Sequence, residues 1–368
     1  YIYLTDSWTK MVSDNASKSN KKEPVTLAEI NSALGTTLRN FYGIEWIDAT
    51  TLLVTENSKY YSYSIASKSG KLLFEAPDTA ENQSVDKTKS KVAYTKENNL
   101  YAIINGKEVA ITSNTDKNIV SGQGIARSEF GISGRIFWSP KSNFLAFYQK
   151  DETDVADYPL LDINETPGKL VSIKYPMIGQ KSERPKVGIF NLASRKTVFI
   201  SPRGNSDDYL TNLSWSPDEK YVLIAEVNRG QNSMDLNVYD AISGNFVRTL
   251  FNEKSTTWVE PEHPAFFPSN KSNNFVWISE KSGFNNLYYY SIEGKLIKQL
   301  TNNSFATREI IGSNAAGTEI YFKATGANAT NMLVYKVDLK GKQTLVTKDQ
   351  GVHNVSISSD GNWVFDEF

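Results

Sequence analysis

The sequence contains no cysteine, and its 368 residues include only two histidines, His263 and His353. The lack of cysteine excludes disulfide bonds, thiolate metal sites and a cysteine nucleophile. Two histidines are too few for a histidine-rich metal cluster, and neither has a serine or cysteine partner in a recognisable motif. We therefore expect no metal site and no cofactor, and we interpret both histidines as surface or structural residues.

An excess of charge of one sign is also missing. The 40 Lys and Arg residues balance 41 Asp and Glu residues, and no run of basic residues follows one face. This balance argues against nucleic acid or an anionic membrane surface as a partner. No apolar run reaches the roughly 18 residues that a membrane-spanning helix needs, so we predict no membrane span.

The Gly-x-Ser-x-Gly nucleophile elbow of serine hydrolases does not occur in the chain. A Ser-His-Asp triad needs that strained elbow together with a base and an orienting acid. We therefore expect no catalytic residue in this sequence.

A repeated pattern of strands begins near Tyr42, where apolar residues start to alternate with a period of two. The second strand of the unit recurs at residues 52–54, 92–94, 144–147, 221–224, 275–278, 320–322 and 363–365. The third recurs at 60–63, 100–103, 187–190, 236–239, 287–290 and 333–337, followed by hairpin signals such as Ser69-Gly70 and Asn105-Gly106. Four strands in about 40 to 54 residues is the period of a β-propeller blade. The pattern predicts an all-β propeller of four-stranded blades with seven units visible.

The N-terminal region does not follow this repeat. Residues 1–4 have the composition of a strand, and residues 11–24 are polar and lack a period, which is typical of a linker. Thr26, with Glu29 three residues on and Gly35 at the end of an apolar helical pattern, predicts one short helix over 26–34. We therefore divide the chain into a strand and polar linker, 1–25, and a propeller domain, 26–368.

Two departures from the repeat stand out. The chain between the second strands at Leu145 and Val222 is about thirty residues too long, and the excess falls at 151–186. Its four X-Pro pairs favour an extended arm over a helix, and its exposed apolar residues should pair with a partner. The last unit stops at Phe368 after its second strand. We expect either residues 1–4 to help close the ring or the protein to continue beyond Phe368.

Two further motifs have structural or functional interpretations. The Trp-Ser-Pro turns at Trp138 and Trp215 are most simply structural, because a tryptophan at a strand end fills space between blades. Glu129 stands between Ser128 and Phe130 in a glycine-flanked loop. A carboxylate at a strand mouth can bind a cation, although most loop glutamates are only solvated.

The run Ser128-Glu129-Phe130-Gly131, followed by Trp138-Ser139-Pro140 and the strand at 145–148, resembles the N-terminal propeller of the dipeptidyl peptidase IV family of serine exopeptidases, especially its Bacteroidetes-type members. The resemblance extends from about Thr26 to Phe368. It implies an eight-bladed propeller that caps a C-terminal α/β-hydrolase domain, which we expect to lie beyond this chain. It also implies a periplasmic or extracellular protein and a homodimer formed through arm 151–186.

The same resemblance suggests a substrate-binding site. In that family a Glu-Glu pair on a short propeller helix binds the free amino terminus of a peptide. Glu129 matches the second glutamate, Ser128 occupies the place of the first, and Arg127 precedes them. Phe266 is a candidate wall of a side pocket, while the family's carbonyl-binding arginine has no clear counterpart around residues 74–77. The expected substrate-binding residues are Glu129, Ser128, Arg127 and Phe266.

Two functions remain open at this point. The chain can be the propeller of a dipeptidyl- or tripeptidyl-peptidase-like exopeptidase that gates substrate and recognises the peptide N-terminus. It can also be a free-standing secreted propeller that binds a partner without chemistry. Glycoside hydrolysis would need two inward carboxylates about 5 to 9.5 Å apart, and the apolar ring-lining positions argue against it. The sequence that follows Phe368 would separate the first two functions.

Overall fold

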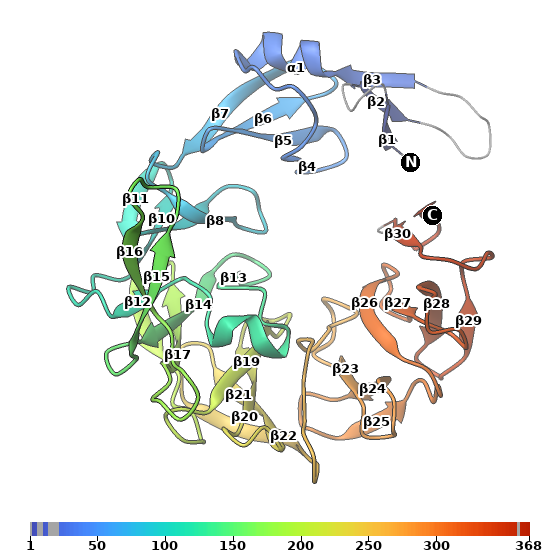
Figure 1. Ribbon diagram of the computed structural model, residues 1–368. Coiled ribbons are helices and arrows are strands. Elements are labelled where there is room, and N and C mark those ends of the chain that lie inside the picture. Colours follow the sequence, from blue (N-terminus) through green and yellow to red (C-terminus); the bar gives the residue numbers. More distant parts are fainter. Residues whose placement is uncertain (1, 6–9, 14–21, 359–360) are drawn as a thin grey trace. The chain divides into compact units, whose positions relative to one another are not determined.

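The computed structural model describes residues 2–5, 10–13, 22–358 and 361–368 (Figure 1). Nearly all of its regular structure is antiparallel β-sheet, as the strand repeat predicts. The chain forms two compact units, residues 1–113 and 114–368, and each is described by itself.

The first unit begins with a three-stranded sheet of β1 (Ile2–Thr5), β2 (Lys10–Ser13) and β3 (Lys22–Thr26). The prediction of a polar linker over 11–24 is therefore wrong for β2 and β3, while residues 14–21 lie outside the described residues. The pairing of these strands comes from backbone hydrogen bonds, which do not require an apolar period in the side chains. Because β1 pairs with β2, it does not extend another sheet of the described chain.

Helix α1 (Leu27–Leu34) follows β3 and confirms the predicted helix. Thr26 and Glu29 form a capping box: the Glu29 amide donates to Thr26 Oγ1 at 3.3 Å, and the Thr26 amide donates to Glu29 Oε2 at 2.9 Å. Gly35 ends the helix in the left-handed conformation with φ 68°. The buried Leu27 and Ile30 pack against the core of the first four-stranded sheet.

Two four-stranded sheets complete the first unit. They contain β4 (Ile44–Trp46), β5 (Thr51–Glu56), β6 (Lys59–Ser64) and β7 (Ser69–Glu75), then β8 (Glu81–Val85), β9 (Val92–Lys96), β10 (Asn99–Ile104) and β11 (Lys107–Ala110). The expected turn at Ser69-Gly70 is wrong, because both residues lie in β7. Gly70 is needed for close packing instead: a Cβ there would lie 2.4 Å from Leu34 Cδ2 and 2.3 Å from the Ser62 carbonyl oxygen.

The second unit continues the same meander. Its first sheet contains β12 (Ile119–Ser121), β13 (Ile136–Trp138), β14 (Phe144–Asp151), β17 (Arg184–Asn191) and β18 (Lys196–Phe199), and the next contains β19 (Tyr209–Trp215), β20 (Tyr221–Val227), β21 (Ser233–Asp240) and β22 (Phe246–Lys254). A three-stranded sheet of β23 (Phe275–Ser279), β24 (Asn286–Tyr290) and β25 (Leu296–Gln299) follows. The last two sheets contain β26 (Thr307–Ser313), β27 (Glu319–Ala324), β28 (Leu333–Asp338) and β29 (Gln343–Leu345), and then β30 (Asn354–Ile357) and β31 (Val364–Glu367). All predicted second and third strands of the repeat fall on these or the first unit's strands, with ends shifted by a few residues.

The predicted arm is a two-stranded hairpin. Strands β15 (Asp157–Asp162) and β16 (Lys169–Lys174) pair with each other and with no other strand of the described chain. This confirms an extended arm in place of a helix. Apolar side chains remain exposed along it, including Leu161 (63%), Ile163 (80%) and Leu170 (68%).

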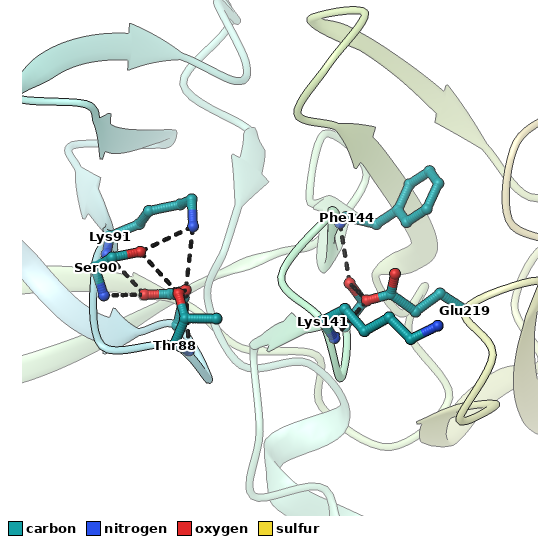
Figure 2. A network of polar contacts seen from close by, with 8 residues as sticks. Thr88, Ser90, Lys91, Lys141, Phe144 and Glu219 are labelled. Atoms are coloured by element: carbon teal, nitrogen blue, oxygen red, sulfur yellow. Dashed lines mark hydrogen bonds and ion pairs between the residues drawn. The ribbon is translucent and has the colours of Figure 1, made fainter. Parts of the chain in front are cut away.

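Adjacent blades of the second unit are joined at their Trp-Ser-Pro turns (Figure 2). The buried Glu219 carboxylate accepts hydrogen bonds from Ser139 Oγ at 2.5 Å, the Lys141 amide at 2.6 Å and Asn143 Nδ2 at 2.7 Å. Trp215 Nε1 donates to the Phe137 carbonyl oxygen at 3.0 Å. These bonds confirm the structural interpretation of both turns. In the first unit, the corresponding turn uses its own buried Asp86, which accepts from the amides of Ser90 and Lys91 at 2.7 Å each.

His353 is a structural histidine of the last sheet. Its ring is buried, with 2% of the residue exposed, and Nδ1 lies 2.7 Å from Asp366 Oδ2 while Nε2 lies 2.9 Å from the Asp349 carbonyl oxygen. Both ring nitrogens therefore have partners, as expected from the sequence.

Candidate functional site

The candidate site lies on a loop that interrupts the first strand of a blade. Strands β12 and β13 both pair with β14, and residues 122–135 leave the sheet between them. The two ends of this excursion are tied to one residue: the Gly122 amide donates to the Tyr148 carbonyl oxygen at 2.8 Å, and the Tyr148 amide donates to the Arg135 carbonyl oxygen at 3.1 Å. A loop whose ends meet in this way is a compact platform that a rigid sheet holds in place.

The middle of the excursion is η1 (Ala126–Gly131), in which two short turns meet at a kink and the backbone at residues 127–130 is not helical. Glu129 is extended, with φ −63° and ψ 162°, and its neighbours have left-handed backbone conformations, with φ of 50° at Ala126, 50° at Arg127, 66° at Ser128 and 54° at Phe130. The regular short helix that the family resemblance implies is therefore not formed here. Left-handed conformations are unfavourable for residues with a Cβ, so surrounding contacts must stabilise this turn.

Apolar anchors provide part of that stabilisation. Ile125, Phe130 and Ile132 are each at least 94% buried and pack into the cores of neighbouring blades. The Phe130 ring lies 4.8 Å from the ring of Tyr209. These side chains point inward and leave the intervening polar residues at the surface.

Gly131 fixes the turn against a neighbouring loop. A Cβ at this position would lie 1.8 Å from the carbonyl oxygen of Glu262, and φ is 66°. Glycine is therefore required both for space and for backbone conformation. The contact brings η1 beside the loop Glu260-Pro261-Glu262-His263.

The neighbouring loop borders an acidic pocket. Glu253, Glu260, Glu262 and Glu280 line it. Burial raises the pKa of Glu253, against the opposing effects of Ser279 and Lys281, whose Nζ lies 3.7 Å from Glu253 Oε1. Burial also lowers the pKa of Lys281, which lies 4.0 Å from the centre of the Tyr288 ring. In the sequence, this loop is singled out only by His263, although Glu260 and Glu262 on either side of Pro261 indicate an acidic surface there.

Polar contacts from the arm complete the support of η1. The Ala126 amide donates to Glu183 Oε1 at 2.6 Å, and Glu183 Oε2 lies 3.6 Å from Lys150 Nζ. The Arg127 guanidinium lies 4.5 Å from the centre of the Tyr175 ring and donates to the Lys174 carbonyl oxygen. The guanidinium of Arg127 is thus already engaged by the arm.

Ser128 and Glu129 are exposed to solvent. Within the described part of the chain, no hydrogen bond or ion pair involves the Glu129 carboxylate or the Ser128 hydroxyl. The structure therefore places a carboxylate without a partner next to buried anchors, and such a group can accept hydrogen bonds from a cation.

The structure brings Arg127, Ser128 and Glu129 together, but it places Phe266 elsewhere. Phe266 pairs with Val276 through backbone hydrogen bonds of 3.0 and 2.7 Å and packs against the core between β23 and β27. It borders a pocket of about 440 Å³ formed by residues 266–271 and 312–315, which contains no residue of η1. Its role as a wall of a substrate pocket stays a prediction.

No helix in the described ranges combines the length and hydropathy needed to cross a membrane.

Comparisons with known proteins identify relatives of this chain. It is 24% identical over 331 residues to dipeptidyl aminopeptidase B of Saccharomyces cerevisiae, covering 82% of this chain and 40% of that protein. It is also 24% identical over 290 residues to dipeptidyl peptidase 4 of Trichophyton rubrum, covering 74% of this chain and 37% of that protein.

Solved structures show the same fold. The crystal structure of a Bacteroides ovatus protein described as a dipeptidyl aminopeptidase IV superposes with a TM-score of 0.86 at 30% identity, over 100% of this chain and 57% of that one. Porphyromonas gingivalis dipeptidyl peptidase 4 gives a TM-score of 0.81 at 19% identity, over 100% and 54%. The chain thus spans 37% to 57% of the length of these four relatives.

A family model described as the dipeptidyl peptidase IV (DPP IV) N-terminal region matches residues 55–368. This match covers most of the chain and agrees with the propeller fold of the structural relatives. The chain therefore belongs to the family of dipeptidyl peptidase IV N-terminal regions.

Proposed function

We propose that this chain is the substrate-gating propeller of a serine exopeptidase and that it recognises the free amino terminus of a peptide. The hydrolytic chemistry would come from a C-terminal α/β-hydrolase domain of the same protein. The names of the relatives and the family match support this assignment, and the exposed, unpaired carboxylate of Glu129 is the observation on which it depends.

Glu129 suits this role because its position is fixed while its charge is not neutralised. Its neighbours Phe130 and Gly131 are held by packing, so little ordering of the turn is needed when a ligand binds. A charge-assisted hydrogen bond to an ammonium group contributes about 1.5 to 3 kcal/mol. That energy favours a peptide end over an internal segment, which has no ammonium group to offer.

The test is Glu129→Gln in the full-length protein. Toward peptides with a free amine, kcat/KM should fall roughly 10- to 150-fold. This factor corresponds to a loss of about 1.5 to 3 kcal/mol of transition-state stabilisation. Amino-acetylated peptides of the same sequence should be affected little. Glu293→Gln, at an exposed hairpin turn, is the matched control and should behave as wild type. Equal losses for free and acetylated peptides would show that Glu129 only supports the loop.

We further propose that the arm, β15 and β16, binds a second copy of the protein. Leu161, Ile163 and Leu170 expose most of their surface, and the two strands have no other partner among the described strands. The location in the periplasm or outside the cell stays a prediction from the family resemblance.

A further inference from the structure

The arm, residues 151–186, contacts η1 at two separate points. Tyr175 and the Lys174 carbonyl, where the chain leaves β16, hold the Arg127 guanidinium. Glu183, just before β17, accepts the Ala126 amide at 2.6 Å. Both contacts fall on residues that immediately precede Ser128 and Glu129.

These contacts stabilise a stretch of backbone with unfavourable conformations. Ala126, Arg127 and Ser128 are three successive residues with positive φ, and each such residue costs of the order of 1 kcal/mol or more. Phe130 and Gly131 anchor the far side of Glu129 through packing, and Ile125 is buried on the near side. Between Ile125 and Glu129, the arm adds the contacts to the Ala126 amide and to the Arg127 guanidinium. Removing the arm contacts should therefore make the backbone that precedes Glu129 more mobile, and the position of the Glu129 carboxylate less well defined.

The contacts of Arg127 with the arm also disfavour an ion pair between Arg127 and Glu129. A free guanidinium two residues from Glu129 would be a competing cation for that carboxylate. Stacking on Tyr175 and donation to the Lys174 carbonyl hold the guanidinium away, and the Glu129 carboxylate has no partner within the described part of the chain. The engaged Arg127 is thus poorly suited to contact substrate directly, in contrast to the sequence-based expectation.

We propose that Arg127, Tyr175 and Glu183 are positioning residues that couple the arm to Glu129, so that the conformation of the arm sets how well the peptide ammonium is recognised. Tyr175 extends the coupling into the hairpin, because its ring lies 5.7 Å from that of Tyr158 in β15. This inference rests on the proposed function of Glu129.

The experiment measures amine selectivity in the full-length protein. Selectivity is the ratio of the inhibition constants of one dipeptide amide in its amino-acetylated and free-amine forms. Arg127→Ala and Tyr175→Ala should each lower this ratio about tenfold. Tyr175→Phe, which keeps the aromatic face, should stay within twofold of wild type. Arg203→Ala removes a similar stacked pair, 4.7 Å from Phe246, and should leave the ratio unchanged.

A second measurement does not depend on activity. Hydrogen exchange of residues 122–135 should accelerate in Arg127→Ala, while exchange in β19 and β20 stays as in wild type. Acceleration throughout the second unit would refute a local positioning role, as would no change in the excursion.

Glu129→Gln in the same inhibition assay separates this inference from the proposed function. If its selectivity falls while that of Arg127→Ala does not, the positioning role is refuted and recognition of the amine stands. If Glu129→Gln leaves the selectivity unchanged, recognition of the amine by Glu129 is refuted. The proposed coupling between the arm and Glu129 is then refuted as well.

Discussion

Glu219 offers a direct test of how the blades of the second unit are held together. Its carboxylate accepts three hydrogen bonds from the neighbouring turn, at 2.5 Å from Ser139 Oγ, 2.6 Å from the Lys141 amide and 2.7 Å from Asn143 Nδ2. Three charge-assisted bonds at about 1.5 to 3 kcal/mol each would suggest a cost of about 4.5 to 9 kcal/mol for Glu219→Ala.

That sum is too large, because the three donors differ in access to water. Ser139 is completely buried and its hydroxyl would lose the acceptor of its proton, although it would still accept from the Phe144 amide at 2.9 Å. Lys141 and Asn143 are exposed residues whose donors can bind water instead. We therefore expect Glu219→Ala to lower the free energy of unfolding by about 2 to 4 kcal/mol. Glu219→Gln keeps one acceptor oxygen and should cost about 1 to 2 kcal/mol.

The assay is urea unfolding followed by tryptophan fluorescence, since Trp138 and Trp215 both lie at this joint. A double-mutant cycle with Ser139→Ala should give a coupling energy of about 1 to 3 kcal/mol. The reasoning fails if Glu219→Ala costs less than 1 kcal/mol, or if Glu219→Gln costs as much as Glu219→Ala.

Three further predictions follow from local geometry. Burial acts to raise the pKa of Asp218, but hydrogen bonds from Ser216 and Asn273 outweigh it and leave the pKa below 3.8. Asp218→Asn should therefore be less stable than wild type above pH 3.8, and the difference should vanish as the pH falls through the folded-state pKa. A stability difference in urea titrations that does not depend on pH would contradict this. Gly131→Ala should lower the melting temperature and the amine selectivity, with Gly124→Ala, which meets no atom within 4 Å, as the silent control; equal behaviour of the two variants would be inconsistent with the contact to Glu262. Replacing Leu161 and Leu170 by Ser should convert a dimer of the full-length protein to a folded monomer in sedimentation, and an unchanged dimer would rule out the arm as the interface.

Much of the fold was predictable because it depends on short-range patterns. The period-two strands and the Thr26–Glu29 capping box each involve residues within a few positions of one another. The arm was predictable as an extended segment from its prolines. The strands β2 and β3 were missed because their sequences lack an apolar period, and the function of Gly70 was missed because its close neighbour, Leu34, belongs to a helix far away in sequence.

The candidate site shows the same division. The sequence alone, with its resemblance to a known family, singled out Glu129 and its neighbours. Only the tertiary structure decided that Arg127 is held by Tyr175, that Ala126 is bonded to Glu183, and that Glu129 itself stays unpaired. These contacts join residues about fifty positions apart on an irregular loop, where no periodicity constrains the side chains, so their geometry depends on how the arm packs against the blade.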